Sequence, residues 1–254
     1  MFIEVLGPLR IRYGQQRVNI PGEKLRALIA TLALSAGEVV SGATLFDELW
    51  GETPPRTAAN TLHGHIARLR RTLVQQTGDP SAQELVQTSS AGYRLEIDPE
   101  NVDSIRFTRL VECVGATVHD DPRGGIALLE SALRMWHGMA LSDVGSGVTC
   151  STAAVRLEAM KAVARELLVE AKLELGLHQH VVPELEQLLT QYPLRERFGE
   201  QLMLALYRSG RQADAIGVYH QVRRRLDDDL GLEPGPGMRA RLAEILRQEP
   251  SLLG

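Results

Sequence analysis

The pattern of apolar and polar positions changes its period several times in the first hundred residues. Residues 2–20 alternate over short runs broken by glycine and proline, which predicts short strands. Leucine and isoleucine in 25–32 recur every three or four residues, the spacing of one buried helix face. A second helix is expected after Ser41, a third over 56–73, and a β-hairpin over 85–97. This order of strands, three helices and hairpin predicts an α+β winged helix-turn-helix with an additional N-terminal sheet.

From residue 98 onward the pattern indicates helices only. Gly176 and Gly210 lie 34 residues apart, which is the tetratricopeptide period. We therefore expect an all-α domain of tetratricopeptide-like helical repeats. We place the domain boundary so that 1–97 form the winged helix and 98–254 the helical domain. The expected helices are 104–118, 122–136, 153–175, 181–191, 196–209, 212–229 and 237–247.

The third predicted helix has two contrasting faces. Its leucines and isoleucine at positions 62, 66, 69 and 73 fall within about 60° of one another, which predicts one narrow buried stripe. The opposite side carries polar residues together with Gly64, whose lack of a side chain permits close approach of the backbone. Because a helix fits the major groove of DNA, this polar face is a candidate for contacting base edges and phosphates.

The charge of the chain is uneven. Net charge is −4 and hydrophobic residues make up 44%, which is typical of a globular protein. Residues 1–97 carry a net charge of +1 and 98–254 a net charge of −5, and no carboxylate occurs between Thr53 and Gly78. A local basic segment on a mildly acidic protein is common among sequence-specific nucleic-acid binders.

Several other classes are disfavoured. No apolar run is long enough to span a membrane, and the N-terminus has no signal-peptide pattern, so we expect a cytoplasmic protein without a membrane partner. Two cysteines cannot build a disulfide framework. Ser146 lacks the outer glycines of a nucleophile elbow, and the histidine pairs lack further ligands at metal-binding spacing. We expect no catalytic residues, no metal site, no cofactor and no enzymatic activity.

The candidate DNA-binding residues lie on the third helix and on the hairpin, which would form the wing. Tyr93 is expected to pack beneath the wing, and Arg70, away from the centre of the helix face, is expected to contact phosphate. An ordinary exposed turn is an equally good interpretation of the hairpin. The helix candidates are Arg56, Thr57, Asn60, Thr61, His63, Gly64, Arg68, Arg70 and Arg71, and the wing candidates are Ser89, Ser90, Tyr93 and Arg94.

Several sequence blocks resemble the Streptomyces antibiotic regulatory protein family. In the first half they are LRAL at 25–28, DELWG at 47–51, PPRTA at 54–58, IARLRR at 66–71 and AGYRL at 91–95. In the second half they are WHG at 136–138, ALSD at 140–143, PLRE at 193–196, LALYRSGR at 204–211 and LGLEPG at 230–235. The resemblance covers nearly the whole chain. It implies an OmpR-type winged helix followed by a bacterial transcriptional activation domain.

The resemblance also implies a function. Members of the family activate antibiotic and other secondary-metabolite gene clusters. They bind direct repeats in double-stranded DNA near the promoter as two protomers side by side, and they recruit RNA polymerase with its sigma factor. The groove-facing positions are not a fixed signature of the family, so the target sequence does not carry over. The alternative is a helical-repeat scaffold whose N-terminal domain binds protein or RNA.

Overall fold

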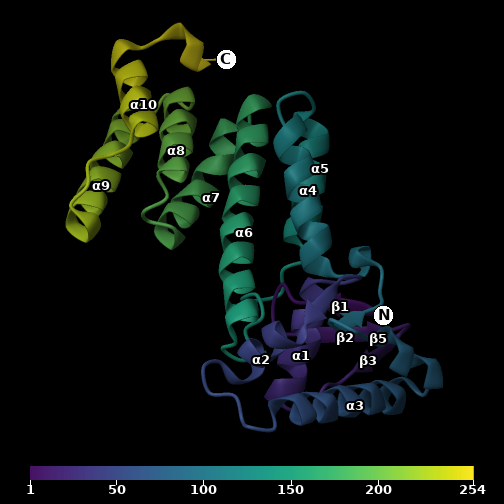
Figure 1. Cartoon of the computed structure of the whole chain (residues 1–254). Helices are drawn as coiled ribbons and strands as arrows, with labels where there is room; N and C mark the ends of the chain where they lie inside the picture. The colour runs from purple at the N-terminus through teal and green to yellow at the C-terminus, as the bar shows by residue number, and fades with distance from the viewer. Residues whose placement is uncertain (254) are drawn as a thin grey trace. The chain divides into compact units, whose positions relative to one another are not determined.

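The computed structural model describes residues 1–253 and confirms the predicted fold class, a winged helix-turn-helix followed by a helical domain. Two three-stranded antiparallel sheets, with strand orders β1-β2-β3 and β4-β6-β5, accompany the first three helices (Figure 1). The elements of this part are β1 (Phe2–Glu4), β2 (Arg10–Tyr13), β3 (Gln16–Val18), α1 (Glu23–Leu34), β4 (Val39–Ser41), α2 (Gly42–Trp50), α3 (Ala58–Thr77), η1 (Pro80–Leu85), β5 (Val86–Ser89) and β6 (Gly92–Leu95).

The remainder of the described chain is helical. Its elements are η2 (Pro99–Asn101), α4 (Asp103–Thr117), α5 (Pro122–Leu133), α6 (Val148–Glu174), α7 (His178–Gln191), α8 (Glu196–Arg208), α9 (Gln212–Leu230), α10 (Pro236–Arg247) and η3 (Pro250–Leu253). By its contacts the chain divides into two compact units, the first made of 1–113 with 131–162 and the second of 114–130 with 163–254. The boundary that the sequence places at residue 98 stays a prediction.

The core of the first unit follows the predicted periodicity. Each of β1, β2 and β3 buries one apolar residue, namely Ile3, Ile11 and Val18, while the residues beside it are partly or fully exposed. Helix α1 adds a buried face, and Ser41 caps α2 by accepting a hydrogen bond from the amide of Thr44 at 3.0 Å. The hydrophobic stabilisation therefore comes from a sheet and helices whose apolar faces are all predictable locally.

A segment that lies far along the chain completes this core. Leu141 and Val144 are buried among the residues of the winged helix, and the amide of Leu141 donates hydrogen bonds to the carbonyls of Val5 and Gly7. The carboxylate of Asp103, at the start of α4, accepts bonds from the amides of Val5 at 2.8 Å and Leu6 at 3.1 Å. Burial raises the pKa of Asp103 to about 6. The winged-helix part is thus held together partly by residues beyond 98.

The second unit consists of stacked helices. Helix α8 packs against α7, α9 and α10 (Figure 1). Gly176 and Gly210, the pair at the predicted repeat spacing, share a left-handed φ of 76°, a conformation that favours glycine where a helix ends. Leu185 and Tyr219, which align in the same register, are both buried. The tetratricopeptide-like pattern thus describes real helical repeats. No helix within residues 1–253 combines the length and the apolar character that crossing a membrane requires.

Candidate DNA-binding surface

Helix α3 begins and ends later than the sequence predicts. It runs from Ala58 to Thr77 instead of 56–73, and Arg56 lies in the exposed turn before it. Its N-cap residue Thr57 makes no side-chain cap bond, but its carbonyl accepts hydrogen bonds from the amide and the hydroxyl of Thr61 at 2.9 and 3.0 Å. Gly78, in the left-handed conformation, ends the helix because it satisfies the carbonyl of Val74 without steric cost.

The two faces of α3 are as predicted. The stripe of Leu62, Ile66, Leu69 and Leu73 is buried. The opposite side is exposed over its whole length, and the exposed residues are Thr57, Asn60, His63, Gly64, Ala67, Arg68 and Arg71. This surface offers amide, hydroxyl and guanidinium groups as hydrogen-bond partners and carries no carboxylate. It can therefore contact phosphates and base edges without repelling them.

Gly64 lies in the middle of this exposed face. A Cβ atom built on it meets nothing within 4 Å, so packing within the protein does not require glycine at this position. Glycine inside a helix costs about 1 kcal/mol relative to alanine. No internal contact accounts for that cost, and the backbone at Gly64 is open to close approach from outside the protein.

Two aromatic rings, tilted relative to each other, are in contact beside the exposed face. The ring of His65 lies 6.1 Å from that of Trp50 in α2, and the ammonium of Lys24 in α1 lies 4.9 Å from the centre of the Trp50 ring. Burial first, and then the charges of Lys24 and Arg68, lower the pKa of His65. His65 packs against Trp50, which is half-buried against the core.

The wing is the hairpin of β5 and β6, with Ser89 paired with Gly92 and only Ser90 and Ala91 between the strands. The turn of the predicted hairpin is therefore only two residues long, because Ser89 and Gly92 belong to the ladder. A Cβ at Gly92 would lie 2.0 Å from the carbonyl oxygen of Val40 in β4. Glycine is required there because the neighbouring strand approaches so closely.

The wing candidates have different surroundings. Ser90 is exposed at the tip and Ser89 is partly exposed. Tyr93 is only 5% exposed, as expected of a residue packed beneath the hairpin, and burial raises the pKa of its hydroxyl. Arg94 donates to Gln87 Oε1 at 2.8 Å and pairs with Glu96 at 2.6 Å. The positive charge of Arg94 is therefore already balanced in the free protein.

Arg70 is expected from the sequence to be available for a phosphate contact, but its guanidinium is bonded within the protein. Its Nε and NH2 groups donate to the carbonyl oxygen of Val86 at 2.9 Å and to the hydroxyl of Thr88 at 2.8 Å. Sequence reasoning singled out Arg70 and missed Thr88, which is 18 residues away. No local signal could have revealed this pair, because it depends on how the hairpin folds back onto α3.

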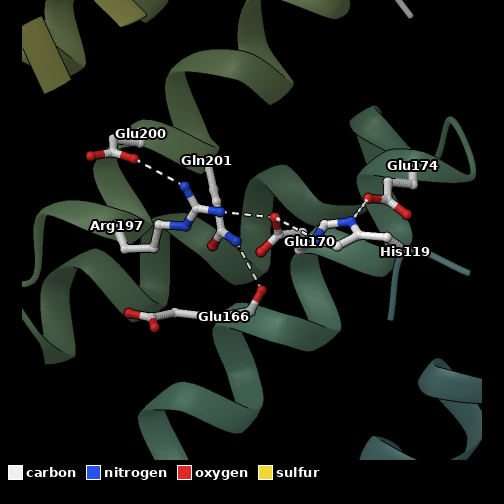
Figure 2. Close-up of polar contacts among 7 residues, drawn as sticks. All are labelled: His119, Glu166, Glu170, Glu174, Arg197, Glu200 and Gln201. Carbon is white, nitrogen blue, oxygen red and sulfur yellow. Dashed lines mark hydrogen bonds and ion pairs between the residues drawn. The ribbon is translucent and has the colours of Figure 1, made fainter. Parts of the chain in front are cut away.

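Charged groups in the second unit are arranged differently (Figure 2). The guanidinium of Arg197 lies between two carboxylates, 2.9 Å from Glu170 and 3.2 Å from Glu200. His119 contacts Glu174, while Gln201 donates to the backbone carbonyl of Glu166 at 2.8 Å. In this network the guanidinium of Arg197 is already paired with carboxylates of the protein.

Comparison with known proteins finds a different family domain in each half of the chain. A family model for "Transcriptional regulatory protein, C terminal" matches residues 16–95, and one for "Bacterial transcriptional activator domain" matches residues 102–246. The transcriptional regulator RedD of Streptomyces coelicolor is 46% identical over 250 residues, which cover 98% of this chain and 71% of that protein. The chain belongs to the Streptomyces antibiotic regulatory protein family.

Further members show the same likeness over the full chain. The regulatory protein DnrI of Streptomyces peucetius is 35% identical, and the match covers 99% of this chain and 94% of that protein. A solved structure of EmbR from Mycobacterium tuberculosis, in complex with a low-affinity phosphopeptide, superposes with a TM-score of 0.90 at 33% identity. That match covers 99% of this chain and 68% of EmbR.

As a member of the Streptomyces antibiotic regulatory protein family, the chain is a DNA-binding transcriptional regulator of the activator type and not an enzyme.

Proposed function

We propose that this regulator activates a secondary-metabolite (antibiotic) biosynthetic gene cluster by binding direct repeats at its promoter. The exposed face of α3, from Thr57 to Arg71, enters the major groove, and the wing tip at Ser90 contacts the adjacent backbone or minor groove. The observation that carries the proposal is this face itself, which is exposed, polar, free of carboxylates and bare at Gly64.

The roles of the individual side chains follow from their surroundings. Asn60 is exposed and presents an amide that can bond bidentately to an adenine edge. Arg68 and Arg71 are exposed and have no hydrogen-bond or ion-pair partner within residues 1–253, so they supply phosphate or guanine contacts. Tyr93 and Arg94 support the wing from beneath and beside it.

Assembly on DNA completes the proposal. Two protomers bind neighbouring repeats, and each raises the effective concentration of the other, so that two weak sites are occupied cooperatively. The helical domain contacts the second protomer and RNA polymerase with its sigma factor. We expect the second protomer to bind chiefly on DNA.

A mobility-shift titration tests DNA recognition. The probe is a duplex with two direct repeats at helical-turn spacing, selected from a random pool, and the competitor is a scrambled duplex. We expect two-step cooperative retention at moderate salt, and a probe with one repeat should bind more weakly. Equal affinity for scrambled DNA would count against sequence-specific recognition and favour a protein- or RNA-binding role.

Two further measurements test the partners. Analytical ultracentrifugation without DNA should show a monomer, and a stable dimer at low concentration would contradict assembly on DNA. Transcription reconstituted with RNA polymerase holoenzyme should increase only on templates that carry the repeats. An equal increase in transcription from templates without the repeats would show that recruitment of RNA polymerase does not depend on binding to the repeats.

A further inference from the structure

The wing is attached to α3 at two places on the same side of the helix. The ring of His63 lies 6.2 Å from the ring of Tyr93 in β6, edge to face at 72°. Two helical turns further on, Arg70 reaches β5. Positions 63 and 70 face the same direction because seven residues make nearly two full turns. The two contacts together determine how the hairpin is angled against the helix.

Arg70 makes the more directional of the two attachments. Its planar guanidinium donates from two nitrogens to two acceptors in β5, the carbonyl oxygen of Val86 and the hydroxyl oxygen of Thr88. A rigid fork with two donors fixes orientation as well as distance. A lysine at this position has one nitrogen and cannot reproduce that geometry.

The acceptor at Val86 belongs to an open sheet edge. Strand β5 pairs with β6 on one side only, because the order of the sheet is β4-β6-β5. The amide of Glu96 donates to the carbonyl of Leu85, and Val86 is aligned with Leu95. In an antiparallel ladder alternate carbonyls point outward, so that of Val86 faces away from β6. Arg70 satisfies a backbone group that the sheet leaves unpaired.

Neighbouring arginines on α3 provide the contrast. Arg68 and Arg71 are exposed and have no hydrogen-bond or ion-pair partner within the described part of the chain, whereas Arg70 is half-buried and has two. The helix thus carries arginines of two kinds, those open to an outside ligand and one that is bonded to the wing.

We propose that Arg70 is a positioning residue that fixes the wing against α3 and so sets the spacing between the two DNA contacts of the protomer. The inference rests on the proposed function, in which α3 and the wing bind one duplex. It differs from the expectation drawn from sequence, in which Arg70 contacts phosphate directly.

The test is a set of binding titrations by fluorescence anisotropy at several salt concentrations, with the full chain and the selected repeat duplex. Arg70→Lys should weaken binding about tenfold, because losing two hydrogen bonds that orient the wing costs roughly one decade in affinity. The uncharged variant Arg70→Gln is measured beside it, and its salt slope should equal that of wild type because Arg70 contacts no phosphate. Arg71→Gln is the matched control and should lower the slope by about 0.9, the value for one phosphate contact.

Thr88→Val provides a second variant that leaves α3 and its charge unchanged. It should weaken binding less than Arg70→Lys does, and the double variant should be no weaker than Arg70→Lys alone, because both changes disrupt one attachment. Amide hydrogen exchange in β5 should rise in both single variants without DNA.

The possible results distinguish the positioning role of Arg70 from the proposed DNA-binding function. Wild-type affinity in Arg70→Lys, or a salt slope that falls in Arg70→Gln as it does in Arg71→Gln, would overturn the positioning role and favour a phosphate contact. Additive effects of the Arg70 and Thr88 changes would overturn it as well. If wild type shows no preference for the repeats, the proposed function fails and this inference fails with it.

Discussion

Two regions of the molecule use arginine in opposite ways. On α3, Arg68 and Arg71 face solvent with no carboxylate nearby on the helix, from Ala58 to Thr77. In the second unit, Arg195 pairs with Glu166. Arg197 bridges Glu170 and Glu200 (Figure 2). The arginines of the first surface have no carboxylate partner, whereas those of the second are already paired with carboxylates.

The difference indicates where an outside polyanion binds. Guanidinium groups that already pair with carboxylates gain little from a phosphate, because the new contact replaces an existing one. Unpaired groups gain the full interaction and release counterions from DNA. Substitutions on α3 should therefore alter DNA affinity and leave the stability of the protein nearly constant. Substitutions in the network of the second unit should alter stability and leave DNA affinity nearly constant.

The largest loss of DNA affinity is expected from Gly64→Glu. The new carboxylate meets open space in the free protein but faces phosphates and base edges in the complex. We expect at least about a hundredfold loss of affinity, because like charges placed together cost several kcal/mol. The thermal midpoint should stay constant or rise, since glycine is the poorer helix former.

Gly64→Ala is the matched control for this change. It should stabilise the protein by about 1 kcal/mol and reduce DNA affinity far less than the glutamate does. Anisotropy titrations and thermal melts of both variants measure the two quantities. Retained affinity in Gly64→Glu would remove α3 from the DNA interface.

Asn60→Ala should have the next largest effect on DNA binding. It should reduce only the preference for the repeat duplex over scrambled DNA. Losing a bidentate contact to a base edge should cost about tenfold on the repeat duplex and almost nothing on scrambled DNA. Gln83→Ala, which removes an exposed amide in η1 outside the proposed surface, is the control. An equal loss on both duplexes would assign Asn60 to the phosphate backbone instead.

Arg195→Gln tests the paired arginines of the second unit. The side chain of its partner Glu166 is 14% exposed, so removing the charge should destabilise the protein by about 1 kcal/mol. Chemical denaturation measures the loss. DNA affinity should remain within twofold of wild type, and a larger drop would show that the second unit contributes to the DNA contact.

The smallest expected effect is a change in how stability depends on pH, and it arises from His119. Its hydrogen bond to Glu174, together with the charge of that carboxylate, raises the pKa of His119 above its ordinary 6.5. A histidine whose pKa is raised by folding adds stability that is complete below the unfolded value and disappears as pH rises through the folded one. Because the pair is exposed, the change should be below about 1 kcal/mol.

Thermal melts between pH 5.5 and pH 9 measure this contribution. Wild type should lose slightly more stability across this range than His119→Gln, and DNA affinity at constant pH should be equal in the two proteins. The same pH dependence in both would show that the contact between His119 and Glu174 contributes no linkage.

Much of the fold and half of the candidate surface can be predicted from the sequence. Each predicted helix in the second half corresponds to an observed one, and the buried stripe of α3 is formed by the four predicted residues. Helix ends were less predictable, as in α3, because the stop is Gly78 rather than the last apolar residue. The roles of Arg70 and Arg94 could not be predicted, since their partners lie on other strands or depend on strand register.

Local pattern by itself determined the secondary structure, the fold class and the polar face of α3. Periodicity reports which side of an element is buried, and that depends on neighbours within a few residues. Only the tertiary structure decided that 131–162 belong to the first unit, that Asp103 holds Val5 and Leu6, and that Arg70 is bonded to the wing. Such contacts join segments far apart in the chain, where directional bonding depends on the folded geometry and leaves no periodic trace in sequence.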